Sequence, residues 1–252
     1  MIYLNKTIET QLNHRSIRQF KDTPIEPETL DTLFKVANRT ASSNGLQTFS
    51  IIRVTDRKKR AQIADICTQD YVKDLPEFLV FIVDAFRNAQ IASEMGVDSD
   101  SKGDMDRFFQ GFTDGAIAAQ NMYTAIESLG MGAVYFGSIL NDPAKIIEIL
   151  ELPKLTFPIF GIGFGYPNQD PMLKPRMDLS LKLFDNKYKI QNNYLNLIKD
   201  YDEEMQTYYD LRKADKPLDA FSKQVASALQ DSNEKRSSLL NIIRDQGFNL
   251  KV

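Results

Sequence analysis

The sequence predicts a layered protein of the α/β or α+β class, in which helices cover a β-sheet. Helix-like and strand-like patterns alternate along the chain, in runs long enough for regular elements. The apolar run Phe78–Val83 is continuous, which is typical of a strand buried on both faces. Of the 252 residues, 42% are hydrophobic, so the chain can build a sizeable core.

The composition argues against several other classes of protein. A net charge of −3 and a pI near 5.4 disfavour a dedicated nucleic-acid binder, which would carry a basic excess. The single Cys67 and single His14 leave no disulfide and no residue set for structural zinc, and we expect Cys67 to be a small buried hydrophobe. No apolar run is long enough to span a bilayer, and the first residues lack the features of a signal peptide. We therefore expect a cytoplasmic protein with no membrane or metal partner.

The elements predicted before residue 130 follow from spacing and capping signals. Ile8 and Leu12 lie four residues apart, on one face of a short helix. Pro27 suits the first turn of a second helix, and Asp56 can cap a third. The predicted helices span 6–13, 27–38, 56–66 and 104–129, the predicted strands span 50–55 and 78–83, and polar loops are expected over 40–47 and 98–103.

In the second half, a strand over 132–138 is predicted to lead into a tight turn at Gly137. A glycine there lets a flat ligand approach the backbone, or it simply marks the end of a strand. We interpret the charged portion 180–252 as an excursion that wraps around the rest of a single domain, rather than as a domain of its own. Further helices are predicted over 143–150, 200–212, 218–230 and 235–245, and a further strand over 155–164.

The cluster His14–Arg18 is the first candidate for function, because it places an imidazole, a hydroxyl and two guanidinium groups within five residues. Such donors suit phosphate oxygens, although a solvated basic turn has the same composition. Lys174 and Arg176 flank Pro175, which favours an extended chain in which both cations point the same way and can meet one anion. A glycine fingerprint of the dinucleotide-binding type is absent, so the sequence does not predict a Rossmann fold.

Four motifs in the same order resemble the flavin-dependent nitroreductase family, and most closely its branch of oxygen-insensitive NADPH nitroreductases and NADPH–flavin oxidoreductases. They are His14–Arg18, Ser42–Gln47, Tyr135–Ser138 and Leu173–Arg176. The resemblance covers nearly the whole chain. It implies an α+β fold with a mixed, mainly antiparallel central sheet flanked by helices, formed by residues 1–252 as one FMN-binding domain. It also implies an intertwined homodimer with FMN at the subunit interface.

The resemblance further implies roles for individual residues. The FMN phosphate and ribityl chain would be contacted by His14, Arg15, Ser16, Lys174 and Arg176. Arg18 would lie near the pyrimidine edge of the flavin, and Gln69 would contact a polar atom of the ring. The partner subunit would contribute Ser42, Asn44 and Gln47, while the backbone of Phe136, Gly137 and Ser138 would lie beside the reactive edge.

The implied reaction is ping-pong transfer, in which hydride passes from NADPH or NADH to FMN N5 and two electrons then reduce a nitroaromatic, a quinone or free flavin. Arg212, with Lys213 and Lys216 in place of the family's later basic residues, would bind the nicotinamide nucleotide. Two alternatives share the same contacts. One is a non-catalytic protein that senses or stores FMN, and the other is a specialised flavin or halogenated-ring chemistry on the same fold.

Overall fold

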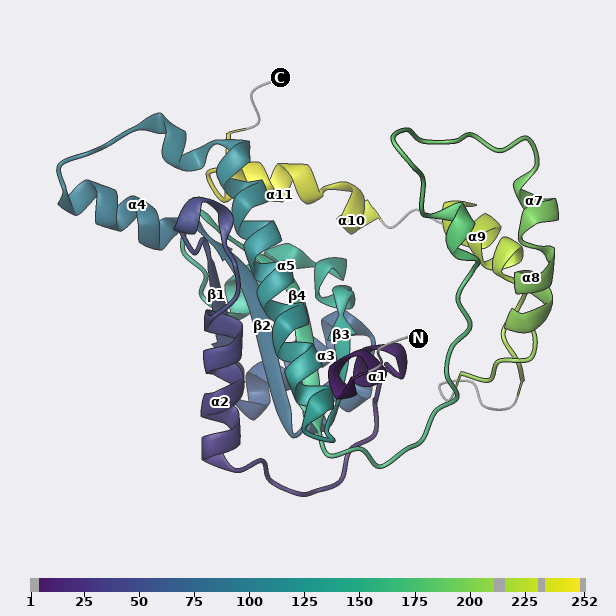
Figure 1. Ribbon diagram of the computed structural model, residues 1–252. Coiled ribbons are helices and arrows are strands. Elements are labelled where there is room, and N and C mark those ends of the chain that lie inside the picture. The colour runs from purple at the N-terminus through teal and green to yellow at the C-terminus, as the bar shows by residue number, and fades with distance from the viewer. Residues whose placement is uncertain (1–4, 211–215, 231–233, 250–252) are drawn as a thin grey trace. The chain divides into compact units, whose positions relative to one another are not determined.

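The computed structural model describes residues 5–210, 216–230 and 234–249 (Figure 1). The chain divides into two compact units, of which the first comprises 1–169 and 233–252 and the second comprises 170–232. Among the described residues, no helix is both long enough and apolar enough to cross a membrane.

The first unit is built on a four-stranded sheet in the order β1-β2-β4-β3. The strands are β1 (Phe49–Arg53), β2 (Glu77–Asp84), β3 (Gly132–Phe136) and β4 (Thr156–Gly165). All three strand pairs are antiparallel, and parallel pairing among the described residues is confined to single bridges such as Ser16 with Ala133. The α+β class with a mainly antiparallel sheet is therefore confirmed.

Helices cover both faces of this sheet. On one face lie α2 (Pro27–Asn38) and the long α5 (Met105–Ser128), and on the other lie α3 (Arg57–Cys67) and α6 (Pro143–Ile149) (Figure 1). Every residue of β2 is buried, as the continuous apolar run predicts. Cys67 is also fully buried, in the cluster that packs α3 against the sheet.

Local signals predicted several boundaries correctly. The side chain of Asp56 accepts hydrogen bonds from the N–H groups of Lys58 and Lys59 at the start of α3. Gly130 follows α5 with a φ of +75°, in the left-handed region that glycine favours. The first helix, α1 (Lys6–Leu12), also forms.

The structure contains one helix that was not predicted, and one predicted helix is shorter than expected. The segment after β2 forms a helix, α4 (Ala85–Glu94), which the sequence pattern did not reveal because exposed residues such as Ile91 blur its apolar stripe. The helix expected over 200–212 ends at Met205. The remaining helices are α7 (Tyr194–Leu197), α8 (Lys199–Met205) and α9 (Phe221–Gln230) in the second unit, and α10 (Glu234–Ser237) and α11 (Leu239–Asp245) in the first.

Candidate functional site

The basic segment His14–Arg18 lies along the outer edge of β3. Ser16 forms a parallel bridge with Ala133, and the N–H of Ile17 donates to the carbonyl of Ala133 at 2.9 Å. Gly132 permits this close approach, because a Cβ built there would lie 2.3 Å from Cγ1 of Ile17. The cluster is therefore anchored to the sheet and is not a solvated turn.

Two side chains of α5 contact the same segment. Glu127 Oε1 lies 2.8 Å from Nδ1 of His14, and the Glu127 side chain is only 12% exposed. The hydroxyl of Tyr123 donates to the carbonyl of Ala133, and the ring of His14 meets that of Tyr123 edge-on, with centroids 5.3 Å apart. One ring nitrogen of His14 is thus engaged by Glu127, so any contact with a phosphate must come from Nε2.

Two stacked phenols lie beneath the segment. The rings of Tyr123 and Tyr135 are 4.9 Å apart, and the hydroxyl of Tyr135 donates to Oε1 of Gln120 at 3.2 Å. Burial raises the pKa of both phenols, and the negative charge of Glu127 raises each further. Both tyrosines therefore stay protonated at neutral pH and serve as hydrogen-bond donors.

Arg15 provides the observation that points most directly to a ligand. Its Nε is buried and has no hydrogen-bond partner among the described residues. A buried charged donor without an acceptor is costly, and an anionic ligand would supply the acceptor. The end of the segment is fixed nearby, because the N–H groups of Arg18 and Gln19 both donate to Oε1 of Gln169, at 3.2 and 2.7 Å.

The turn after β3, Gly137–Asn141, offers a second approach to the backbone. A Cβ built on Gly137 would meet nothing within 4 Å, so this side of the turn is open. Ser138 Oγ is buried beside the thiol of Cys67 and has no other hydrogen-bond partner in the described structure. Burial raises the pKa of the neighbouring Cys67 thiol, and the Ser138 side chain beside it acts in the opposite direction. The net shift keeps the thiol protonated, which makes Cys67 a poor nucleophile.

Gln69 is linked through Tyr71 to Phe136, the residue that precedes this turn. The hydroxyl of Tyr71 donates to Oε1 of Gln69 at 3.0 Å, which leaves the amide NH₂ of Gln69 as a donor. The ring of Tyr71 lies 5.7 Å from that of Phe136, and the Phe136 side chain is buried in the core. Only the backbone of Phe136 can therefore contact a ligand.

The loop Ser42–Thr48 precedes β1 and has an unusual backbone. Asn44, Gly45 and Gln47 all have positive φ, at 52°, 70° and 51°. For residues other than glycine this conformation costs about 1–2 kcal/mol each. The loop is therefore held by contacts from outside its own sequence.

Two groups of the predicted site residues lie at opposite edges of the sheet. The segment His14–Arg18 runs along β3, whereas the loop Ser42–Thr48 leads into β1 at the other edge. On α5, the loop contacts Asp114 and the basic segment contacts Glu127. Thirteen residues of helix correspond to about 20 Å. Within one chain, these two groups do not meet at one site.

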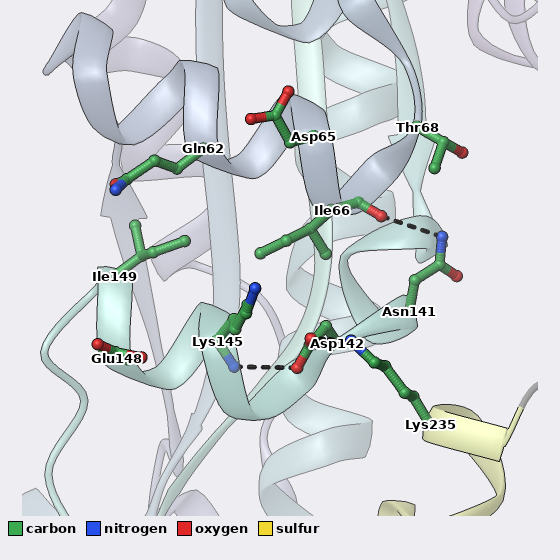
Figure 2. A pocket seen from close by; sticks show the side chains of 10 residues that line it. All are labelled: Gln62, Asp65, Ile66, Thr68, Asn141, Asp142, Lys145, Glu148, Ile149 and Lys235. Carbon is green, nitrogen blue, oxygen red and sulfur yellow. Dashed lines mark hydrogen bonds and ion pairs between the residues drawn. The ribbon is translucent and has the colours of Figure 1, made fainter.

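A pocket of about 760 Å³ opens between α3, the turn after β3 and α6 (Figure 2). None of the predicted site residues that the structure describes lines it, although Thr68 adjoins Gln69 and Asn141 is the last residue of the turn. Lys235 of α10 reaches into the pocket, where its Nζ lies 2.5 Å from Oδ2 of Asp142. The pocket is lined by Gln62, Asp65, Ile66, Thr68, Asn141, Asp142, Lys145, Glu148, Ile149 and Lys235.

The second unit carries the other predicted cations. Lys174 and Arg176 are exposed, and Nη1 of Arg176 donates to the carbonyls of Lys174 and Pro175 at 2.9 and 3.1 Å. Lys216 is exposed as well. Arg212 and Lys213 lie outside the described residues. The joint action of Lys174 and Arg176 with His14–Arg18 stays a prediction.

Comparison with known proteins decides the family. The model of the "Nitroreductase family" matches residues 12–166, and that of its C-terminal domain matches 174–251. The chain belongs to the nitroreductase family. Among its family relatives are the NADPH-flavin oxidoreductase of Vibrio harveyi, 37% identical over 97% of this chain and 99% of the relative, and the oxygen-insensitive NADPH nitroreductase of Salmonella typhimurium, 35% identical over the same shares.

Solved nitroreductase structures share the fold. The NfrA1 nitroreductase of Bacillus subtilis superposes with a TM-score of 0.89 at 33% identity, over 97% of this chain and 100% of that one. The NADPH:FMN oxidoreductase of Vibrio harveyi, solved with NAD⁺, superposes with a TM-score of 0.85 at 35% identity, over 98% and 100%.

Sequence reasoning missed the carboxylates that hold this nitroreductase's candidate segments. Asp114 lies among the small residues Gly111, Gly115 and Ala118 on the buried face of α5, and an acid on an apolar face is a signal that could have been noticed. Glu127 lies one helical turn after Tyr123, but only the folded chain brings His14 to it.

Asp142 allows a test of the contact between α10 and the turn after β3. Desolvation raises the pKa of Asp142, but hydrogen bonds from Lys235 and from the N–H of Lys145 lower it by more, so the net shift is downward. A lowered folded-state pKa adds stability above the unfolded value near 4, and that stability is lost as the pH falls through the folded value. We expect Asp142→Asn to cost about 1 kcal/mol at pH 7 and much less at pH 3, as measured by urea unfolding.

Glu148→Gln is the matched control, because it removes the same charge from an exposed position on the same helix. It should leave the free energy of unfolding nearly unchanged at both pH values. An equal loss of stability at pH 3 and pH 7 in Asp142→Asn would show that the ion pair with Lys235 is not responsible.

Proposed function

We propose that this chain is an FMN-dependent NAD(P)H oxidoreductase that uses NADPH or NADH to reduce nitroaromatics, quinones or free flavin. The buried Nε of Arg15, for which the described residues provide no acceptor, carries the proposal, because it lies in the basic segment fixed to β3 and an anionic ligand would supply that acceptor. Relatives named NADPH-flavin oxidoreductase and FMN reductase (NADPH) support the same reading.

The residues present fit the cofactor. Arg15 buries a polar atom that has no partner among the described residues, and Gly137 leaves one side of the turn open. A phosphate carries about two negative charges, and each hydrogen bond to it from a charged group contributes about 1.5–3 kcal/mol. We assign the phosphate and ribityl chain to His14, Arg15, Ser16, Lys174 and Arg176, and the ring to Arg18, Gln69 and the backbone of Phe136, Gly137 and Ser138.

The chain's own residues bind and orient in this proposal. When bound, FMN supplies the hydride acceptor and the two-electron donor. The buried phenols of Tyr123 and Tyr135 stay protonated, and so does the thiol of Cys67. None of these three groups is assigned a proton transfer or a nucleophilic step.

A second copy of the chain completes the site in this proposal. The loop that carries Ser42, Asn44 and Gln47 enters the sheet at the edge opposite His14–Arg18, so it can reach a flavin only on another copy. We therefore propose a homodimer in which each FMN is contacted by the basic segment of one copy and by the loop of the other.

Anaerobic reduction tests the proposed function. The purified protein should be yellow, and addition of NADPH or NADH should bleach it, with colour returning when a nitroaromatic or a quinone is added. A yellow protein that neither nucleotide bleaches would indicate an FMN sensor or store instead. A colourless protein that takes up no added FMN would refute both functions.

Arg18→Ala and Arg176→Ala should each weaken FMN retention by about tenfold, because each removes a permanent charge assigned to the flavin. Flavin absorbance per protein after gel filtration measures the effect. Arg57→Ala, which removes an exposed arginine of α3, should retain flavin like the unchanged protein. Full occupancy in both test variants would remove these residues from the site.

We also propose that Arg212, with Lys213 and Lys216, contacts the 2′-phosphate of NADPH. A fixed guanidinium fork binds phosphate better than an ammonium group, so Arg212→Ala should raise the KM for NADPH about tenfold and that for NADH far less. Steady-state rates with both nucleotides measure the difference. Equal changes in the two KM values would count against this contact.

A further inference from the structure

Asp114 is a carboxylate buried on the sheet-facing side of α5. The residue is 1% exposed. Its Oδ1 accepts the N–H of Ser43 at 2.7 Å, and its Oδ2 accepts the N–H of Thr48 at 3.2 Å. One side chain therefore holds both ends of the loop that precedes β1.

The loop is held from a second side by α4. Arg87 donates to the carbonyl of Gln47, and Nδ2 of Asn88 donates to the carbonyl of Leu46 at 2.9 Å. The N–H groups are thus bound by α5 and the carbonyls by α4. This division accounts for the left-handed backbone at Asn44 and Gln47, which persists only where surrounding contacts impose it.

The surface of α5 is shaped for this contact. A Cβ built on Gly111 would lie 2.5 Å from the carbonyl oxygen of Thr48, so only a glycine lets the loop approach the helix so closely. A buried carboxylate is costly unless its hydrogen bonds are made, and an apolar side chain would pack here at lower cost. The presence of an acid at this position therefore indicates that Asp114 fixes the conformation of the loop and does not only fill space beneath it.

We infer that Asp114 is a positioning residue, which sets the loop conformation in which Ser42, Asn44 and Gln47 meet the FMN bound to a second copy of the chain. This inference rests on the proposed function. Asp114 acts on a flavin that is held mainly by the other copy. Substitution of Asp114 in one chain must therefore weaken FMN binding at the site of the other chain.

Asp114→Asn tests the inference in the full-length, FMN-loaded protein. The amide keeps the size of the side chain but can accept only through its oxygen, so one loop N–H loses its acceptor. We expect FMN to dissociate about tenfold more readily on dilution, as followed by the fluorescence of released flavin. Asn88→Ala, a change at a half-buried residue of α4, should act in the same direction to about threefold and covers the case in which Asp114→Asn fails to fold.

Glu77→Gln is the matched control, because Glu77 is also a buried carboxylate, which accepts two hydrogen bonds from Arg53 at the far end of β2. It should lower stability without increasing FMN release. Equal release from Asp114→Asn and Glu77→Gln would overturn the inference. Failure of the unchanged protein to bind FMN would instead overturn the proposed function, and the two failures are therefore distinguishable.

Mixed dimers distinguish a positioning role of Asp114 from a general stabilising role. Coexpression of Asp114→Asn with Arg15→Ala chains, under two affinity tags, yields dimers in which one site combines an intact basic segment with an intact loop. We expect these dimers to recover about half of the FMN retained by the unchanged protein. If Asp114 only stabilised its own chain, both sites would stay defective and no retention would return, which would overturn the inference.

Discussion

Two acids of α5, the buried Asp114 and the partly buried Glu127, hold the segments that the proposed site requires. Asp114 binds the loop before β1, and Glu127 pairs with His14 at the start of the segment that runs along β3. Because these segments lie at opposite edges of one sheet, the helix fixes two half-sites that cannot close on each other within a single chain. Burial of charged groups on a helix face is costly. Here that cost is offset by the hydrogen bonds that the two acids form with the segments at the two edges of the sheet.

The rest of the site follows from this arrangement. Anchoring of Ser16 to Ala133 leaves Nε of Arg15 buried with no acceptor in the described part of the chain, and β3 then leads directly to the open turn at Gly137. Burial keeps Tyr123 and Cys67 protonated, so neither of these groups can act as a base. Such a site suits tight binding of an anionic cofactor that carries the chemistry itself.

Much of the fold could be predicted from the sequence because its signals are local. The buried strand β2, the long helix α5 and the cap at Asp56 each depend on residues close in the chain. The helix α4 was missed because exposed apolar residues hide its pattern. The partners of His14 and Ser43 could not be predicted, since Glu127 and Asp114 lie far along the chain and meet them only after folding.

Amide hydrogen exchange with and without FMN tests whether two copies of the chain build one flavin site, because it reports on both half-sites in one experiment. We expect FMN to slow exchange together at Arg15–Arg18, at Gly137 and Ser138, and in the loop Ser43–Thr48. Protection at the first two segments with none in the loop would contradict this expectation, because the loop would then not reach a flavin on the second copy.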